Sequence, residues 1–285
     1  MFPTWREIEV AAYERWERGG RSHGADRDDW SAAEMDLTFQ KNYRPIAEYP
    51  LAASGRLVIG AIPKPSCRFC ERSAPRAEFR EPRPIAPALA VMGPLCMTEI
   101  CDECHEQFAS GIDRDFAAFW ESLADPTHGR VGYPPRSIPI GAYKSLVRMA
   151  ISIMPTRELG QFVDTLEWVG NPDHDFDSSL FSETGCLVYR TAHPQNVPWA
   201  ALFRLVDPDA PLPHVVFILA AANQVVQIAP PLCARDQEID ASEGLRLLPR
   251  SFTTGYGQAM QSAARRFLPL EQAERSRRRI ARLIA

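Results

Sequence analysis

The sequence predicts an α+β fold: a helical hairpin at the N-terminus, a four-cysteine zinc module, and helices packed on a small, mostly antiparallel sheet. Three observations support this prediction. Apolar residues recur at helical spacing near the N-terminus and again around residue 147. Two Cys-x-x-Cys pairs lie between these helices, and short runs rich in β-branched and aromatic residues follow in the second half. We divide the chain into segments 1–45, 57–125 and 139–285.

The first segment favours two helices around a turn, because "WREIEVAAYERWE" and "WSAAEMDLTF" are apolar-periodic and "RGGRSHGADRDD" separates them. Gly19 and Gly20 suit the end of the first helix, and Asp26 or Asp28 suits the start of the second. The aromatic residues expected to pack between the helices are Trp5, Tyr13, Trp16 and Trp30.

The string "AYERWERGGRSHGADRDDWSAAEMDL" resembles a short bacterial family of uncharacterised function, whose pattern is A-Y-x-x-W/Y-E-x-x-G-R-x-x-G followed by D-W-x-x-A-E. The resemblance implies a small helical hairpin and no activity.

The middle segment begins with a predicted strand, "RLVIGAI", and ends at a linker rich in proline and glycine, "DPTHGRVGYPPRSIP". The third segment opens with a helix, "GAYKSLVRMAISIM", which Pro155 ends, and "TRELGQFVDTLEWV" predicts another helix. Strands are expected at 186–192, 200–207, 214–221 and 224–231. We expect residues 257–285 to form a basic helical tail.

The two Cys-x-x-Cys pairs predict one structural Zn²⁺ site, because zinc prefers four thiolate or imidazole ligands in a tetrahedron. Its ligands are Cys67, Cys70, Cys101 and Cys104. The alternative is a redox dithiol, which usually stands alone near a βαβ unit. Cys96, Cys186 and Cys233 fit buried, packed thiols better than ligands.

The stretch from "CRFC" through "FRE", "PIAPAL" and "EICDEC" to Phe108 resembles the zinc-supported HNH endonuclease families, and the helix "AYKSLVRMAISIMP" resembles one that follows such modules. The resemblance implies a treble-clef or ββα module in which zinc is scaffolding. In those families a separate divalent ion cuts the phosphodiester, and a histidine between the two cysteine pairs activates water.

That histidine is absent, since the six histidines are at 23, 105, 128, 174, 193 and 214. Arg83 or Pro84 occupies the aligned position, and neither is a base at neutral pH. One alternative is a rearranged site in which His105, Glu81 and Glu99 hold a second divalent metal. The simpler interpretation is that His105 belongs to the helix starting at the second pair and that Glu81, Glu99, Asp102 and Glu103 are solvated. The other histidines read as exposed loop residues.

Charge limits the function classes. The chain has a net charge of −4, and residues 67–104 hold five arginines against six acids, so a broad nucleic-acid surface is not expected. Basic residues gather instead near the C-terminus, where five candidates for phosphate or partner contact are Arg275, Arg277, Arg278, Arg279 and Arg282.

From these features we expect a cytoplasmic protein, since no signal pattern or membrane span is apparent. The favoured function is a non-catalytic, HNH-related zinc-binding protein, a binding or assembly component of a bacterial system that handles nucleic acid or serves in defence, and a protein partner is expected. The alternative is a working metal-dependent endonuclease that uses His105.

Overall fold

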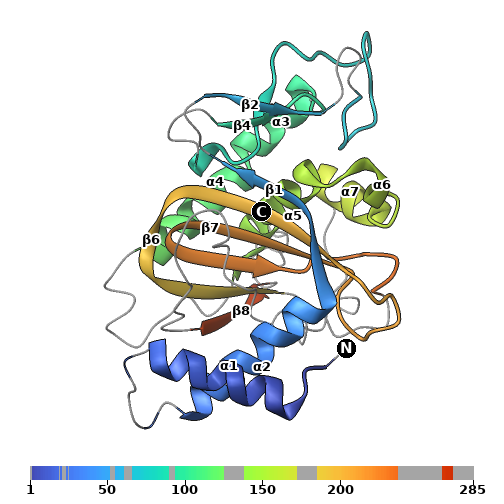
Figure 1. The fold of residues 1–285 in the computed structure, drawn as a ribbon. Helices are drawn as coiled ribbons and strands as arrows, with labels where there is room; N and C mark the ends of the chain where they lie inside the picture. Colours follow the sequence, from blue (N-terminus) through green and yellow to red (C-terminus); the bar gives the residue numbers. More distant parts are fainter. Residues whose placement is uncertain are drawn as a thin grey trace, which may run out of the picture.

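The computed structural model describes residues 2–18, 20, 24, 26–51, 55–60, 66–89, 94–124, 138–171, 185–236 and 265–271. A curved five-stranded sheet lies in the middle of the molecule (Figure 1). The N-terminal helical hairpin lies at one end of this sheet and the cysteine module at the opposite end. The predicted α+β architecture is confirmed.

The hairpin consists of α1 (Trp5–Arg18) and α2 (Asp26–Asn42), as predicted. Thr4 and Glu7 form a reciprocal cap at the start of α1. The Glu7 amide donates to Thr4 Oγ1 at 3.3 Å, and the Thr4 amide donates to the Glu7 carboxylate at 2.6 Å. Gly20 follows α1 with a φ of 81°, a conformation that favours glycine and ends the helix.

The expected aromatic packing inside the hairpin is wrong for two residues. Trp5 is 72% exposed and Tyr13 is 55% exposed. The buried contacts between the helices come from Ile8, Ala12 and Ala33. Small alanines let the two helices approach closely, so the large rings lie at the rim, where Trp5 contacts Trp30 with ring centroids 4.2 Å apart.

The sheet is organised around two long strands, β6 (Gly185–Leu205) and β7 (Val215–Ile228), which pair antiparallel. Four strands were predicted for this region, but the structure has two. The predicted strands 186–192 and 200–207 belong largely to β6, and those at 214–221 and 224–231 belong largely to β7, because each strand continues through the intervening turn residues. Register shifts occur between Arg190 and Trp199, where β6 bends.

Two shorter strands pair with β6. The first is β1 (Tyr43–Pro50), which continues directly from α2 and was not predicted. Its prolines, Pro45 and Pro50, are tolerated because β1 lies at an edge of the sheet, where β6 is its one partner among the described strands.

The other is β8 (Arg265–Glu271), so the predicted helix is wrong for these residues. β8 also pairs in parallel with β5 (Ile138–Pro139). The rest of the predicted tail lies outside the described residues.

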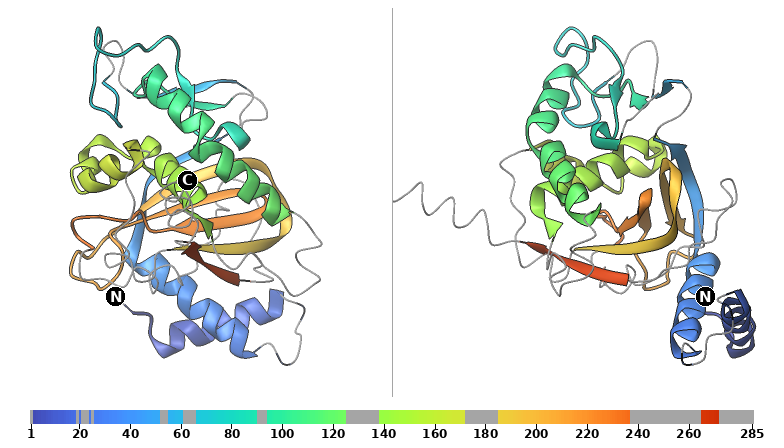
Figure 2. Two further views of the ribbon diagram at one scale, coloured as in Figure 1. Left: turned by 180° about the vertical axis from the view of Figure 1, so that it is seen from behind. Right: turned by 90° about the vertical axis from the view of Figure 1, so that its left-hand side faces the viewer.

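The helix α5 (Ile140–Ile153) lies against the sheet, with α4 (Ile112–Ala124) packed beside it (Figure 2). Every residue of α5 from Gly141 to Ile153 is buried. It ends at Met154, whose extended conformation is the one that a following proline favours. The next predicted helix is divided into α6 (Thr156–Leu159) and α7 (Val163–Gly170).

The cysteine module contains β2 (Leu57–Ile59), β3 (Arg83–Pro84), the 3₁₀ turn η1 (Pro87–Leu89), β4 (Leu95–Met97) and α3 (Asp102–Ser110). β4 pairs in parallel with β2 and antiparallel with β3. One continuous cluster of buried residues extends from Cys67 and Phe108 in the module to Phe217 in the sheet. None of the described helices is both long and apolar enough to cross a membrane.

Candidate metal centre

Four cysteine side chains converge in the module. The Sγ atoms of Cys67, Cys70, Cys101 and Cys104 all lie within 4.8 Å of one another. The sulfurs of Cys70 and Cys101 are 3.7 Å apart. A tetrahedral zinc with Zn–S bonds of about 2.3 Å separates its sulfurs by about 3.8 Å, so these four residues fit such an ion. The described residues thus contain a cluster able to hold a metal, at the predicted positions.

The first pair lies in a tight turn. The Cys67 amide donates to the Arg72 carbonyl at 2.9 Å, and the Glu71 amide donates to the Cys67 carbonyl at 2.9 Å. Glu71 takes a φ of 58°, which is uncommon for a residue with a side chain and reverses the chain direction sharply. This turn directs both thiols of the pair to the same side.

The second pair is presented by a helix. Cys101 is the N-cap of α3, and Cys104 lies in its first turn. Residues three apart share a helix face, so both sulfurs point toward the first pair. From Cys67 onward, the module consists of the cysteine turn, the antiparallel pair β3–β4 and the helix α3. The turn provides one pair of cysteines, and the start of α3 provides the other.

The thiols are electrostatically coupled. A hydrogen bond from Cys104 lowers the pKa of Cys67 to about 5, and the same contact raises the pKa of Cys104. Burial raises the pKa of Cys101 to about 11. Because a metal binds thiolates, its binding must release protons from the neutral members of this cluster.

Two arginines that the sequence did not single out surround the first pair. Arg72 donates from Nε to Cys70 Sγ at 3.3 Å and from Nη2 to Glu103 at 2.6 Å. Arg68 pairs with Glu99, its Nε lying 2.6 Å from the carboxylate, and donates to the carbonyls of Ile151 and Met154. The Arg72 contact would offset the negative charge of Cys70 as a metal-bound thiolate. The Arg68 contacts fix the cysteine turn to the end of α5.

The turn also contacts α7 closely. A Cβ atom added to Gly170 would lie 2.6 Å from the Phe69 carbonyl oxygen. The Phe69 ring packs edge-on against Phe108 of α3 with centroids 5.0 Å apart. Gln107 of α3 donates to the Gly170 carbonyl at 3.0 Å. Both halves of the metal centre therefore rest on the same helix end.

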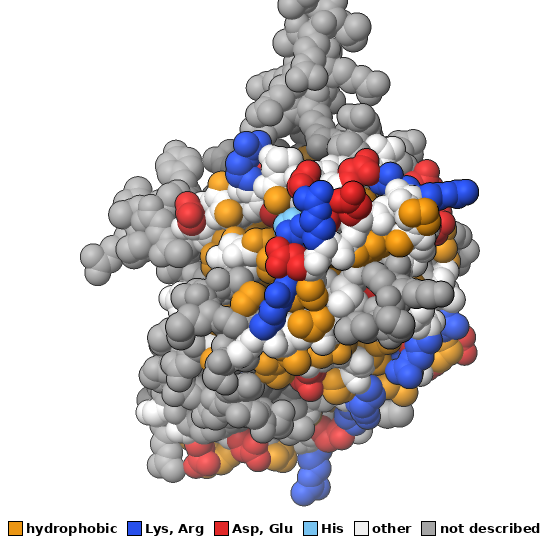
Figure 3. Space-filling model, turned by 90° about the horizontal axis from the view of Figure 1, so that it is seen from above, with side chains coloured by type: hydrophobic (Ala, Val, Ile, Leu, Met, Phe, Trp, Pro, Cys, Tyr) orange, Lys and Arg blue, Asp and Glu red, His pale blue; other side chains and the backbone are white. Residues whose placement is uncertain are grey.

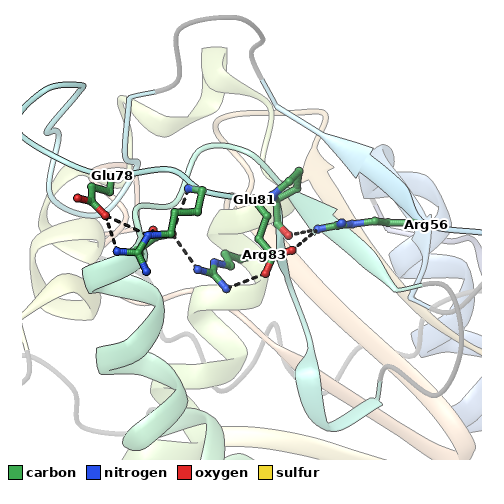
Figure 4. A network of polar contacts seen from close by, with 7 residues as sticks. Arg56, Glu78, Glu81 and Arg83 are labelled. Atoms are coloured by element: carbon green, nitrogen blue, oxygen red, sulfur yellow. Dashed lines mark hydrogen bonds and ion pairs between the residues drawn. The ribbon is translucent and has the colours of Figure 1, made fainter.

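Glu81, Glu99 and His105, the residues of the alternative catalytic site, do not come together around a common ion position. Glu81 is an exposed partner of Arg83 and Arg56 (Figure 4). Glu99 binds Arg68, so the expectation that it is solvated is wrong. Within the described chain, the cysteine cluster is the one group of three or more potential ligands close enough to share an ion, and it does not include His105.

His105 lies on α3, half-buried, and its amide donates to the Cys101 carbonyl at 3.0 Å. Its pKa is lowered, first by burial and then by the charges of Arg83 and Arg148. A neutral imidazole is therefore favoured at pH 7.

Arg83, one of the two residues considered for the position of the absent histidine, forms an ion pair. Arg83 on β3 donates from Nη2 to Asp102 Oδ1 at 2.9 Å, and its side chain is 18% exposed. Asp102, the first residue of α3, is buried, so the expectation that it is solvated is wrong. Glu81 and Glu103 are exposed as expected.

Beneath this pair a second arginine is fully enclosed. Arg148 of α5 is 1% exposed and donates to Asp113 Oδ1 at 2.8 and 3.1 Å and to the Ile85 carbonyl at 2.7 Å. It joins α4, α5 and the chain after β3, and nothing in the sequence spacing indicated this contact.

The remaining predicted residues have different outcomes. Cys96, Cys186 and Cys233 are buried, as expected. His214, the residue before β7, is 6% exposed, so the expectation that it is an exposed residue is wrong. His23, His128 and His174 lie outside the described residues, as do Arg275, Arg277, Arg278, Arg279 and Arg282.

The surface above the cysteine module mixes both signs of charge. Basic and acidic side chains alternate on this face, and neither sign forms a continuous patch in view (Figure 3). The ion pairs Arg80–Glu78 and Arg72–Glu103 contribute to this pattern.

Comparisons with known proteins identify one family. A protein family of unknown function (DUF2934) matches residues 3–38, which comprise α1 and most of α2. This match agrees with the resemblance seen in the sequence and concerns the hairpin alone. The chain matches no curated protein and no solved structure.

Proposed function

We propose that this protein is a non-catalytic relative of the HNH endonucleases, built on a structural zinc of treble-clef type. In this proposal it acts in the bacterial cytoplasm as a binding or assembly component of a system that handles nucleic acid or serves in defence. The observation that carries the proposal is the Arg83–Asp102 ion pair, at 2.9 Å, because Arg83 and Pro84 are the two residues that the resemblance aligns with the water-activating histidine of the HNH pattern.

The order of elements supports the relationship. A cysteine turn is followed by the antiparallel pair β3–β4 and by α3, whose start supplies the second cysteine pair. Zinc held by four thiolates would stabilise this small module directly, since β3 has two residues and β4 has three.

The ion pair argues against catalysis. Arginine stays protonated at any pH at which the protein is folded, so it cannot take a proton from water. Its guanidinium also donates to Asp102 Oδ1, and its positive charge disfavours a divalent ion nearby.

Exposed apolar residues support a protein partner. Leu57 and Val58 are 38% and 37% exposed on β2, which among the described strands pairs with β4 alone and keeps its other edge open. Phe2 and Trp5 are more than 70% exposed on the hairpin. The arginines at 275–282 remain the candidates for a local phosphate contact.

The test is a cleavage assay on purified, zinc-loaded protein. We expect about one zinc per chain and no cutting of plasmid or single-stranded DNA or RNA with Mg²⁺, Mn²⁺ or Ni²⁺. Cleavage by the wild type that is lost in His105→Ala, with the thermal midpoint unchanged, would establish the alternative function. Glu106→Ala, an exposed change on the same helix, is the matched control.

Partner binding is tested separately by affinity capture and mass spectrometry. We expect a protein captured by the wild type to be lost with Leu57→Asp, which places a charge on the open edge of β2. Arg114→Ala, on an exposed position of α4, should retain it. Retention by both variants would exclude the β2 edge as the contact.

A further inference from the structure

A pocket lies away from the cysteine cluster, at the edge of the sheet. Its volume is about 360 Å³. Four chain segments form its walls: α6, the end of β6, the residue before β7, and the chain after β7. Pockets of this size are typical of small-molecule sites.

Main-chain hydrogen bonds hold these walls together. The Leu205 amide donates to the His214 carbonyl at 2.8 Å, and the Ala234 amide donates to the Gln161 carbonyl at 2.9 Å. Behind the wall, the His214 amide donates to the Asp236 carboxylate at 2.9 Å. The pocket is therefore formed before any ligand binds.

The pocket is lined by an excess of positive charge. Arg157, Arg204 and Arg235 face a single lining carboxylate, Glu158, which leaves a net charge of about +2. His214 adds no charge at pH 7, because burial and Arg235 lower its pKa.

Glu158 positions two of the arginines. Its side chain is 7% exposed, and its Oε1 lies 2.5 Å from Arg204 Nη1 and 3.4 Å from Arg157 Nε. The remaining N–H groups of both guanidinium groups keep capacity to bind a further acceptor. The Glu158 carboxylate thus holds the Arg157 and Arg204 guanidinium groups in place.

Arg235 differs from the other two. It is exposed, and no hydrogen bond or ion pair engages its side chain in the part of the chain that the structure describes. Leu205, Val206 and Pro208 add an apolar wall beside these charges. The lining thus combines free guanidinium donors with a surface suited to an organic group.

We propose that this pocket binds the dianionic phosphate group of a small organic molecule. Arginine forks match phosphate oxygens in geometry, and the net charge of the lining matches a dianion. The apolar wall accommodates the organic part of the molecule. This site is independent of the zinc module and of whether the protein cleaves nucleic acid.

The test is isothermal titration of the full-length, zinc-loaded protein with phenyl phosphate, inorganic phosphate and benzoate at constant ionic strength and pH 7.5. Constant ionic strength is needed because salt screens exposed arginines. We expect phenyl phosphate to bind most tightly, inorganic phosphate less tightly, and benzoate at least about tenfold more weakly than phenyl phosphate.

Two variants locate the site. Arg235→Ala should weaken phenyl phosphate at least about tenfold, corresponding to the loss of one charge-assisted contact. Arg114→Ala removes the same charge from α4 and should leave the affinity unchanged. Absence of phenyl phosphate binding to the wild type, equal binding of benzoate, or equal affinity in Arg235→Ala and wild type would each overturn the proposal.

Discussion

The close approach of α7 to the first cysteine pair makes Gly170→Ala an informative change. The new Cβ would lie 2.6 Å from the Phe69 carbonyl oxygen, whereas an ordinary contact begins at 3.4 Å. The turn and the helix end must therefore separate by several tenths of an ångström. The obstructing atom belongs to the backbone between Cys67 and Cys70, so it cannot move by a side-chain rotation.

We expect this change to destabilise the protein by about 1–3 kcal/mol, the usual cost of overpacking a close contact. The loss should be accompanied by weaker zinc binding, because relief of the contact displaces the turn that carries Cys67 and Cys70. The measurements are urea unfolding with zinc present and competition for zinc with a chromogenic chelator.

Gly160→Ala is the matched control. Gly160 has helical dihedral angles and no atom within 4 Å of its added Cβ. Alanine there should be neutral or stabilise by about 0.4–1 kcal/mol, through reduced freedom of the unfolded chain. If Gly170→Ala were as stable as Gly160→Ala and bound zinc equally well, the role assigned to the α7 contact would be wrong.

Four further predictions concern other contacts. Cys101→Ser should lose stoichiometric zinc in elemental analysis and strongly lower the thermal midpoint measured by circular dichroism, because metal binding contributes to folding. Arg72→Ala should retain zinc, but with about tenfold lower affinity in chelator competition, because it removes the hydrogen bond to Cys70 Sγ. Arg148→Met should destabilise the protein by about 3–5 kcal/mol in urea unfolding, since it leaves Asp113 buried without its cation. Adding Asp113→Leu should recover part of that loss. Full stability of the single variant Arg148→Met would contradict the argument. Burial raises the pKa of Asp236 from 3.8 to about 6, so between these values the folded state holds a proton that the unfolded state releases. The free energy of unfolding should therefore fall by up to about 3 kcal/mol as pH rises from about 4 through 6. Urea unfolding of Asp236→Asn should lack this fall, and a pH dependence equal to that of the wild type would contradict the argument.

The cluster of four cysteines was predictable because the signal for each pair is local. Each Cys-x-x-Cys pair places two sulfurs together through a short turn or a helix start, and zinc chemistry requires a second such pair. The arginines around it were not predictable in the same way. Arg72 reaches Glu103 across 31 positions, and Arg68 reaches the end of α5 across more than 80.

The secondary structure was predictable where periodicity was strong and continuous. The hairpin and α5 follow their apolar patterns, whereas β8 was mistaken for a helix because "RRFLPLE" resembles the tail around it in composition. Its strand conformation depends on pairing with both β6 and β5, which lie far away in sequence. Propensity could not supply those partners.

The sequence by itself determined the α+β class, the helical hairpin and the four cysteines that could hold a metal ion, because each helix and each Cys-x-x-Cys pair depends on neighbours within a few residues of the chain. Only the tertiary structure decided that Arg83 and Asp102 are paired and that His214 is buried. It also decided that three arginines and Glu158 share a pocket. These arrangements join segments whose separation in sequence carries no information about their distance in space, and they form only when a common core brings the segments together.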